Sequence, residues 1–543
     1  MGGKRLSRRE ALVAGTALGG AAILGGCSKP KAVPRSRSTS PAAASRSTPR
    51  PPISLAEYAN KRQLAGREDA SAAFQDAVDA LSEGDRLVVP RGSRLWFDGS
   101  GVVSLGGTND ITIDLTGSTI FKTTRRGVYA IFQARGVGTG YGSSARNIVI
   151  QGGRFEGSFK DGAEANLCAF SSNHGQIITI RDCEFIACML GAGHTMDLGG
   201  CDNVTIEDCV WRGFKPGPDR APRTEAVNID ISAFGTGADD PPYLDGLACR
   251  NVHLRRCEFL PYTDPDTKIT YSAPAPLGSH AAREGQPFRN IRATKIKIVD
   301  PVVDRARIGF ADNSYIRGLF HVPGVVGLWI DAQVSVSDGL GSCRVVQVQS
   351  ASKGSSRSTS PNARGVPERP FRTPNLARDV HIDVDVVGMN SAVSDENPIV
   401  FVGGVEGGRA RDIEIRAKIN GASTAAVYVS KADRVSIDFP SCITGRIGAR
   451  IESSTQVSVT GDFRNVTNPV SFRSGSTRSS FGPASVISST PQAAVVECLD
   501  GSDFISAEGI SAVGYARIFS TAPAHSTGTG NAIHPAVVVP TPR

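Results

Sequence analysis

One short pattern returns along most of this 543-residue chain: Asn or Asp, then an apolar, a polar and an apolar residue, a spacer, and a further apolar residue. Because successive side chains of a strand point to opposite faces, this alternation buries one face. Units of about 22 residues that repeat it predict identical coils stacked on one another, each burying its apolar residues only against its neighbours. The pattern therefore predicts an all-β fold, a parallel β-helix. The clear copies are Asn147–Phe155, Gln176–Phe185, Asn203–Trp211 and Asn251–Phe259, and weaker copies start at Asn290, Asp379, Asp412, Arg434 and Gln456.

Cysteines repeat in the same register. Cys183, Cys209 and Cys257 occupy one position of the unit, while Cys201 and Cys249 occupy another. Equivalent positions of stacked coils lie about 4.8 Å apart, which predicts ladders of small buried side chains. The chain has 11 cysteines and no Cys-x-x-Cys. We interpret them as buried thiols, with one or more disulfides, or a metal site, as the alternatives.

The opening of the repeat region differs from the rest of the chain. Phe74, Val78 and Leu81 fall at i, i+4 and i+7, which predicts a helix over residues 71–82. This helix and the subsequent Val88-Val89-Pro90-Arg91-Gly92 resemble the start of the pectate-lyase-like superfamily of right-handed parallel β-helices. The resemblance covers roughly residues 60–480 and implies a single-stranded right-handed solenoid whose first coil is capped by the helix. That superfamily includes lyases, hydrolases, epimerases and non-catalytic surface proteins, so it implies a fold more than a reaction.

The N-terminal segment has the pattern of an export signal. A basic segment, Lys4 to Arg9, precedes an apolar stretch from Ala11 to Gly26 that is short for a membrane span. Ser7-Arg8-Arg9-Glu10-Ala11-Leu12 resembles a twin-arginine motif, and Leu24-Gly25-Gly26-Cys27 resembles a bacterial lipobox with Cys27 as the lipidated residue. An uncleaved hydrophobic anchor is the alternative. Either way we expect an exported protein, lipid-anchored at the cell membrane or on the extracellular face of the cell envelope.

The remaining organisation is inferred from composition. We expect a signal peptide at 1–27, a disordered tether at 28–55, the β-helix at 56–480, and a C-terminal cap and tail at 481–543. Residues 1–50 hold ten Lys or Arg and one acidic residue, a charge of +9, which leaves −1 of the formal +8 for residues 51–543. A nucleic-acid-binding fold needs a basic face of its own. The charge balance therefore gives no support to a nucleic-acid partner.

Polar residues gather on three consecutive coils between residues 190 and 290. The segments are His194-Thr-Met-Asp197-Leu198, Glu225-Ala-Val-Asn228-Ile-Asp230 and Gly278-Ser279-His280. In the first two, alternation places Met196, Leu198, Val227 and Ile229 inside the coil. Asp197, Asn228 and Asp230 should then point outward from one sheet, with carboxylates about 5–8 Å apart.

Paired carboxylates at such distances suit glycoside hydrolysis, in which one group protonates the leaving oxygen and the other attacks or activates water. We predict Asp197 and Asp230 as the pair, Glu225 as the alternate acid, and His194 and His280 as supporting groups. Neighbouring insertions at 214–224 and 233–246 should wall the face. Asn228, Arg220, Arg223 and Arg283 are the predicted substrate-binding residues, the last for an acidic sugar.

The three segments also resemble an arrangement in exported bacterial β-helix proteins presumed to act on polysaccharide. That resemblance implies a site and a polysaccharide partner, without a defined reaction. We expect a monomeric hydrolase that needs no cofactor or metal. The alternatives are a lyase or epimerase that holds Ca²⁺ on Asp197, Glu225 and Asp230, and a non-catalytic glycan-binding or structural protein. Asp and Asn that only cap turns are the simplest explanation of any single residue.

Overall fold

The structure is a computed structural model of the whole chain, which divides into two compact units, Met1–Pro49 and Arg50–Arg543. The residues that the structure describes all belong to the second unit. They are residues 50–97, 102–123, 130–135, 138–160, 164–191, 193–216, 225–232, 245–279, 282–302, 318–337, 344–354, 369–390, 398–422, 425–499 and 501–521.

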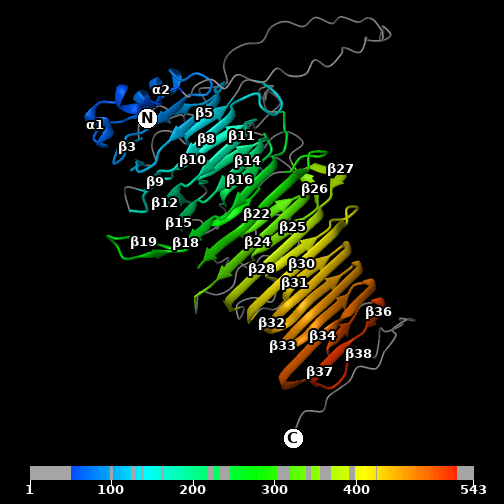
Figure 1. Cartoon of the computed structure of the whole chain (residues 1–543). Coiled ribbons are helices and arrows are strands. Elements are labelled where there is room, and N and C mark those ends of the chain that lie inside the picture. The colour runs from blue at the N-terminus through cyan, green and yellow to red at the C-terminus, as the bar shows by residue number, and fades with distance from the viewer. Residues whose placement is uncertain are drawn as a thin grey trace, which may run out of the picture. The chain divides into compact units, whose positions relative to one another are not determined.

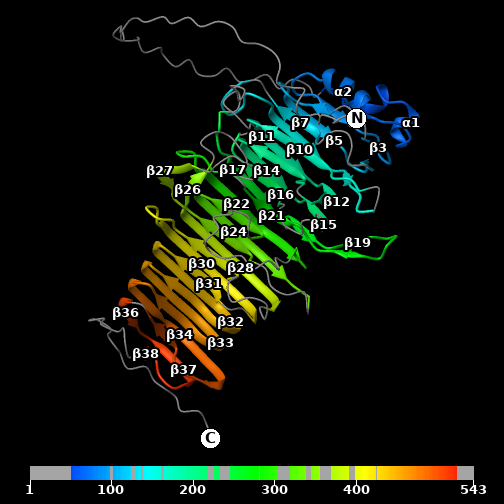
Figure 2. The ribbon, with the colours of Figure 1, turned by 180° about the vertical axis from the view of Figure 1, so that it is seen from behind.

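The chain forms a right-handed parallel β-helix in which each coil contributes a strand to three parallel ladders (Figures 1 and 2). The fold class expected from the repeat is confirmed. We call the first ladder the site sheet. Its strands, in order, are β4 (Val103–Ser104), β7 (Ala130–Arg135), β10 (Cys168–Asn173), β13 (Met196–Gly199), β16 (Glu225–Asp230), β21 (Ala275–Gly278), β23 (Phe320–Pro323), β25 (Val346–Gln349), β29 (Val400–Gly403), β31 (Ala425–Ser430), the last parts of β32 (Ala432–Glu452) and β33 (Thr455–Arg473), β35 (Val496–Cys498) and β38 (Phe519–Thr521).

The second sheet carries the strands in which the repeat pattern was recognised. It runs through β1 (Ile53–Ser54), β2 (Arg86–Val88), β5 (Asn109–Asp114), β8 (Arg146–Gln151), β11 (Gln176–Arg181), β14 (Asp202–Glu207), β17 (Arg250–Arg255), β22 (Phe288–Val299), β24 (Val325–Ser335), β28 (Arg378–Asn390), β30 (Ala410–Ala422), the first parts of β32 and β33, β34 (Thr477–Gln492) and β36 (Asp503–Ala507).

The third sheet is formed by short strands at first and by the continuations of longer ones later. It comprises β3 (Arg94–Trp96), β6 (Thr119–Phe121), β9 (Arg154–Glu156), β12 (Glu184–Leu190), β15 (Val210–Lys215), β18 (Glu258–Leu260), the later parts of β22, β24, β28, β30 and β34, the middle parts of β32 and β33, and β37 (Ile510–Tyr515). Two antiparallel pairs lie outside the three ladders: β19 (Tyr262–Thr263) with β20 (Thr270–Tyr271), and β26 (Ala351–Gly354) with β27 (Arg369–Asn375). Paired strands thus continue past residue 480, as far as β38.

In three of the four clear repeats an Asn sits at a corner of the coil in the left-handed backbone region, and in the repeat at Gln176–Phe185 this corner is taken by Ile177, with φ of 56°. Asn147, Asn203 and Asn251 have φ of 54°, 57° and 53°. Among residues with a side chain, Asn and Asp adopt this region most readily. The repeat therefore begins with these residues because the corner requires a positive φ. Gly327, with φ of 76°, fills the same corner of a later coil.

Within the described ranges, helices are confined to the N-terminal end of this unit: the 3₁₀ turn η1 (Leu55–Glu57), α1 (Lys61–Leu64) and α2 (Ser71–Asp79). The fully buried Phe74 of α2 packs edge-on against Phe97 and Phe132, with ring centroids 5.9 and 5.4 Å away. The helix expected over 71–82 is confirmed in type and ends three residues earlier. Its role as a cap of the first coil stays a prediction.

Stacked side chains fill the interior of the coils. Phe155, Phe185, Trp211 and Phe259, each the last residue of a clear repeat, form one aromatic stack with successive centroids 5.2, 4.8 and 4.8 Å apart. The nine described cysteines form no disulfide, and eight are buried. The Cys201 N–H donates to the Cys249 Sγ, 3.3 Å away, so these residues stack as expected. Cys27 and Cys343 lie outside the described residues.

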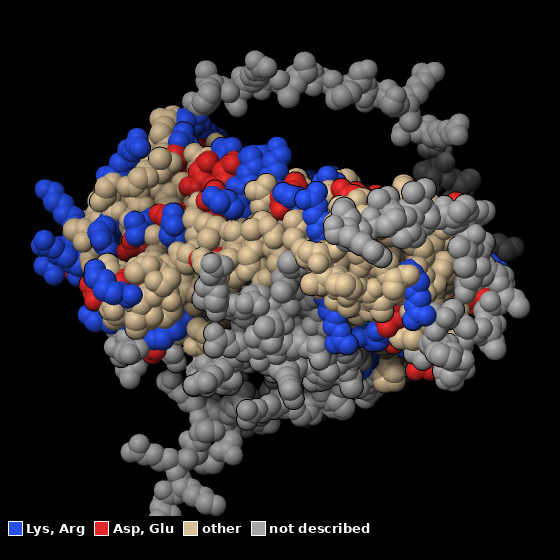
Figure 3. Space-filling view, turned by 90° about the horizontal axis from the view of Figure 1, so that it is seen from below, with Lys and Arg blue, Asp and Glu red and all other residues tan. Residues whose placement is uncertain are grey.

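The surface shows no continuous basic area among the described residues on the face that Figure 3 displays. Lys and Arg groups lie beside Asp and Glu groups there, with uncharged areas between them (Figure 3). No helix in the described part of the chain is both long and apolar enough to cross a membrane.

Candidate functional site

The three predicted segments lie on neighbouring strands of the site sheet, β13, β16 and β21. Asp197 of β13 is in register with Asn228 of β16, which is in register with Gly278 of β21. Met196, Leu198, Val227 and Ile229 are fully buried. Asp197 and Asp230 are partly exposed, so the outward orientation expected from the alternation is confirmed.

The two aspartates lie diagonally across adjacent strands. Asp230 is in register with Gly199, two residues beyond Asp197. A strand spacing of about 4.8 Å and a rise of about 3.3 Å per residue put their Cα atoms about 8 Å apart. The Asn228 Nδ2 donates to Asp197 Oδ1 at 3.0 Å, and the Ile231 N–H donates to Asp230 Oδ1 at 2.9 Å. Each carboxylate is therefore held by a hydrogen bond and still reaches the surface.

Glu225, at the start of β16, has no exposed surface and lies between two histidines. Its Oε1 lies 2.7 Å from Nε2 of His321, and its Oε2 lies 3.4 Å from Nδ1 of His194. His194 Nδ1 is also 3.0 Å from the Glu225 carbonyl oxygen. The imidazoles are themselves buried, with 7% and 2% of His194 and His321 exposed. A buried carboxylate needs such partners, because an unpaired charge in the interior is costly.

Gly278 makes the contact between Glu225 and His321 possible. It occupies the register position between Asn228 and His321. A Cβ on Gly278 would lie 2.1 Å from Cε1 of His321 and 2.6 Å from Cγ of Glu225. The missing side chain therefore leaves the space in which the imidazole and the carboxylate meet. The sequence shows no sign of this contact, because an insertion separates the strand of His321 from β21 and no repeat marks its register.

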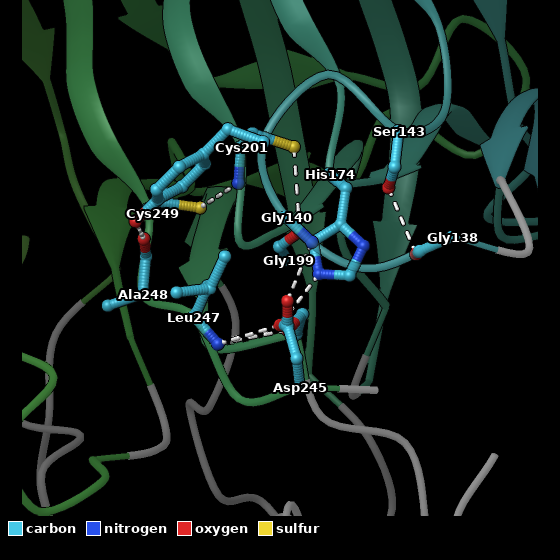
Figure 4. Close-up of polar contacts among 12 residues, drawn as sticks. Gly138, Gly140, Ser143, His174, Gly199, Cys201, Asp245, Leu247, Ala248 and Cys249 are labelled. Atoms are coloured by element: carbon cyan, nitrogen blue, oxygen red, sulfur yellow. Dashed lines mark hydrogen bonds and ion pairs between the residues drawn. The ribbon is translucent and has the colours of Figure 1, made fainter. Parts of the chain in front are cut away.

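A second polar cluster, also missed from the sequence, lies at the end of the same strands (Figure 4). The buried His174, just after β10, has its Nε2 2.8 Å from Oδ1 of Asp245. That oxygen also accepts from the Ser232 hydroxyl at 2.6 Å and from the Leu247 N–H at 3.1 Å, while Asp245 Oδ2 accepts from the Gly140 N–H at 2.8 Å.

Burial alone raises the pKa of Asp245, but the hydrogen bond from Ser232 and those from Leu247, Gly140 and His174 outweigh it and lower the pKa. Asp245 is therefore held as an anion. Asp245 is the first described residue after the segment that follows β16, and its hydrogen bond from Ser232 fixes it close to the end of β16, two residues beyond Asp230.

Aromatic and basic side chains continue the row of Asp197, Asn228 and Gly278 beyond His321. The next positions are Gln347, Phe401, Tyr428 and Arg450. The Phe401 and Tyr428 rings lie 5.3 Å apart, and the Arg450 guanidinium lies over the Tyr428 ring at 4.7 Å. Burial, with Glu452 hydrogen-bonded to the hydroxyl, raises the pKa of Tyr428 to about 12.

The other predicted residues are placed less favourably or fall outside the described part. The Arg283 side chain donates to the carbonyl oxygen of Asp245, so it supports the base of the insertion. Arg220, Arg223 and His280 lie outside the described residues. Within the described ranges no three His, Cys, Asp or Glu side chains are grouped to hold one metal ion.

Comparison with known proteins supports the fold alone. No known protein family and no curated protein sequence matches the chain. Among solved structures, the Streptococcus pneumoniae surface protein and adhesin PfbA is similar over 78% of this chain and 100% of its own, with a TM-score of 0.52 and 16% identity. The catalytic unit of a GH87 α-1,3-glucanase from Streptomyces thermodiastaticus is similar over 89% and 68%, with a TM-score of 0.42 and 12% identity. A mannuronan C-5 epimerase A-module from Azotobacter vinelandii is similar over 90% and 100%, with a TM-score of 0.38 and 10% identity.

Proposed function

We propose that this protein is an exported, lipid-anchored enzyme that hydrolyses glycosidic bonds of a polysaccharide on the outer face of the site sheet. The observation that carries the proposal is the pair Asp197 and Asp230: two partly exposed carboxylates on adjacent strands, each held by a hydrogen bond. A β-sheet ladder has no need of two outward carboxylates here, whereas cleavage of an acetal needs both an acid and a base.

The separation of the pair favours one of the two stereochemical courses. The Cα atoms of the two aspartates are about 8 Å apart, and carboxyl groups at a similar separation, within roughly 6.5–9.5 Å, would leave room for a water between base and sugar. One aspartate would protonate the leaving oxygen while the other accepts a proton from that water, which attacks the anomeric carbon from the opposite side. The Asn228 amide would orient the Asp197 carboxylate, and Glu225 with its two histidines would fix β16 beneath them.

A digest of a polysaccharide library, analysed by mass spectrometry, tests this proposal first. We expect hydrolytic products from the native protein, and Asp197→Asn or Asp230→Asn should each lower the rate by a hundredfold or more, in the range of about 10²–10⁴ for lost acid or base catalysis. Proton NMR of the first product should show inversion at the anomeric carbon. Asp462→Asn, an exposed carboxylate of β33, is the matched control and should leave the rate unchanged.

Other outcomes separate the alternatives. Full activity in both site variants would refute the assignment of the pair. Unsaturated products that absorb in the ultraviolet and vanish with a chelator would identify a lyase. Glycan binding that persists in the double variant while the native protein yields no product would identify a binding protein.

Export and anchoring have their own test. Cys27→Ala should release the protein from the membrane fraction, while Arg8→Lys with Arg9→Lys should keep it in the cytoplasm. Cys498→Ala is the control for the loss of a cysteine elsewhere and should leave the protein in the membrane fraction.

A further inference from the structure

A tryptophan stands on the outer surface of the second sheet, a different face of the coil from the aspartate pair. Trp329, on β24, is 45% exposed. On the neighbouring strands of the sheet, Arg292 is its register partner on one side and His381 on the other, and Glu414 is the register partner of His381. A single exposed apolar side chain needs no explanation in general. This one differs, because it lines a hollow of about 280 Å³ together with polar side chains.

The indole ring is held in place. The His381 ring stacks on it, with centroids 4.7 Å apart and planes 25° apart. Nδ1 of His381 in turn lies 2.8 Å from Oε2 of Glu414. His381 thus covers one face of the indole, and 45% of the residue is exposed. A ring fixed before binding loses little freedom when a ligand stacks on it.

Charged groups line the same hollow as the ring. Asp383, Glu414 and Asp438 line the hollow with one guanidinium, that of Arg416. Arg416 lies 3.4 Å from an Asp383 oxygen and 3.9 Å from an Asp438 oxygen. These carboxylates are half-exposed, so their remaining acceptor positions face solvent. The hollow combines a flat apolar surface with several hydrogen-bond acceptors and an excess of negative charge.

The hollow continues along the sheet. A second one of about 470 Å³ shares His381, Glu414 and Ser436 with the first and adds the bidentate pair Arg434 and Asp412. Together the two hollows form an open groove across β28, β30 and β32. We call this groove, from Trp329 to Arg434, the second-sheet groove.

We propose that the second-sheet groove binds a neutral oligosaccharide segment, with Trp329 stacked on the apolar face of one sugar ring. A pyranose has an apolar C–H face and a rim of hydroxyl groups. The exposed part of the indole matches the C–H face, and the carboxylates of Asp383 and Glu414 would accept hydrogen bonds from the hydroxyl groups. The negative excess disfavours uronate polymers and nucleic acids by charge repulsion. The groove lies outside the aspartate pair, so the proposal stands whether or not that pair is catalytic.

Binding is tested on the full chain carrying Asp197→Asn and Asp230→Asn, so that no probe is consumed. The probes are maltohexaose, cellohexaose, laminarihexaose and xylohexaose, with hexagalacturonate as the anionic comparison. Calorimetry should show that at least one neutral hexasaccharide binds and that Trp329→Ala weakens it at least tenfold, while Trp329→Phe, which keeps a flat ring, weakens it less than threefold. Tyr58→Ala, an exposed aromatic elsewhere (37% exposed), should have no effect.

A fluorescence measurement checks the location. Trp211 is buried and Trp329 is the most exposed of the three tryptophans, so the bound probe should protect the emission from acrylamide quenching. The proposal is overturned by any of three results: no neutral hexasaccharide binds, Trp329→Ala binds as tightly as its parent, or hexagalacturonate binds more tightly than every neutral probe. Self-association that depends on Trp329, seen by sedimentation velocity, would assign the groove to a second copy and overturn it too.

Discussion

At the scale of single residues, the site depends on a side chain that is absent. Gly278 interrupts a row whose neighbouring positions carry Asn228 and His321, and its lack of a Cβ lets His321 reach Glu225. Glycine is required here because it leaves room for the neighbouring side chains, and not because of its backbone freedom. The buried Glu225 would otherwise lose a partner in the interior, where an unpaired carboxylate is destabilising.

Gly278→Ala should therefore lower both stability and activity. The added methyl group collides with His321 and Glu225, and overpacking of this kind costs about 1–3 kcal/mol. Urea unfolding should show this loss, and the hydrolysis rate should fall with it. In a His321→Ala background the same substitution should cost less than half as much, because the colliding ring is gone. Equal costs in both backgrounds would contradict the collision.

Residue-scale contacts were only partly predictable from the sequence. Alternation alone gave the outward direction of Asp197 and Asp230, because the inward residues beside them are all apolar. It gave no indication of the contact between His174 and Asp245, which are 71 residues apart. Such a contact depends on where an insertion returns to the coil, and no periodicity encodes that point. The length of an insertion likewise hid the register of His321.

At the scale of the element, the residue at each coil corner decides how much the positive φ of that corner costs in stability. Asn290, with φ of 52°, also donates from Nδ2 to Oδ1 of Asn251 at 2.9 Å. Gln456 has φ of 55° at the equivalent corner, without the local preference of Asn for this region. Left-handed backbone costs ordinary residues about 1–2 kcal/mol.

Two substitutions at these corners should change the free energy of unfolding in opposite directions. Asn290→Ala should destabilise by about 1–2 kcal/mol, through strain and the lost hydrogen bond, whereas Gln456→Asn should stabilise by about 0.5–1 kcal/mol. Gln333→Asn, at an exposed strand position outside the corners, is the control and should bring no gain. Thermal or urea unfolding measures all three. A loss of stability in Gln456→Asn would contradict the corner explanation.

Asp114, at the end of β5, gives the early coils a pH-dependent stability. Burial alone raises its pKa, but hydrogen bonds from Thr116, Arg86 and Gln151 outweigh burial and lower the pKa to about 2. Because the folded pKa lies below the unfolded value of 3.8, the charged form stabilises the fold fully above about pH 4. That contribution is lost as the pH falls toward 2.

Asp114→Asn should thus be less stable than the native chain at pH 7, and the difference should close between pH 4 and 2. Arg86 is half-exposed, so solvent screening limits the difference to about 1 kcal/mol. Urea unfolding at several pH values measures it. Asp76→Asn, exposed on α2, should show no such pH dependence. A constant difference down to pH 2 would contradict the role of the Asp114 charge.

At the scale of the whole molecule, the coils are held by stacked side chains, and no disulfide joins the described cysteines. Burial raises the pKa of the Cys188 and Cys442 thiols to about 12, which suppresses the reactive thiolate. This is the scale at which the sequence was most informative, because a repeated pattern reports on every coil at once. The stack from Phe155 to Phe259 and the Cys201–Cys249 contact are both direct consequences of that register.

The thiols provide a global test of this packing. In the native protein the eight buried described cysteines should not react with a thiol reagent, and guanidinium should expose them together. Reducing agent should leave the melting temperature unchanged. A melting temperature that falls on reduction would reveal a disulfide. Cys498 is partly exposed, but burial raises its pKa to about 11, so it should react slowly and still faster than the eight buried thiols.

The in-register parallel ladder of the site sheet also fixes the spacing of side chains along the coil axis. Successive positions of the row from Asp197 to Arg450 lie one strand spacing, about 4.8 Å, apart along the axis. A polymer lying along that axis would meet the exposed positions of this row at multiples of that spacing, and their side chains would set the chemistry of each contact. Exchanging one exposed side chain alters one contact, whereas deleting a whole coil would displace every later position by one strand spacing. A change of ligand could thus be made by substitution, without remodelling the fold.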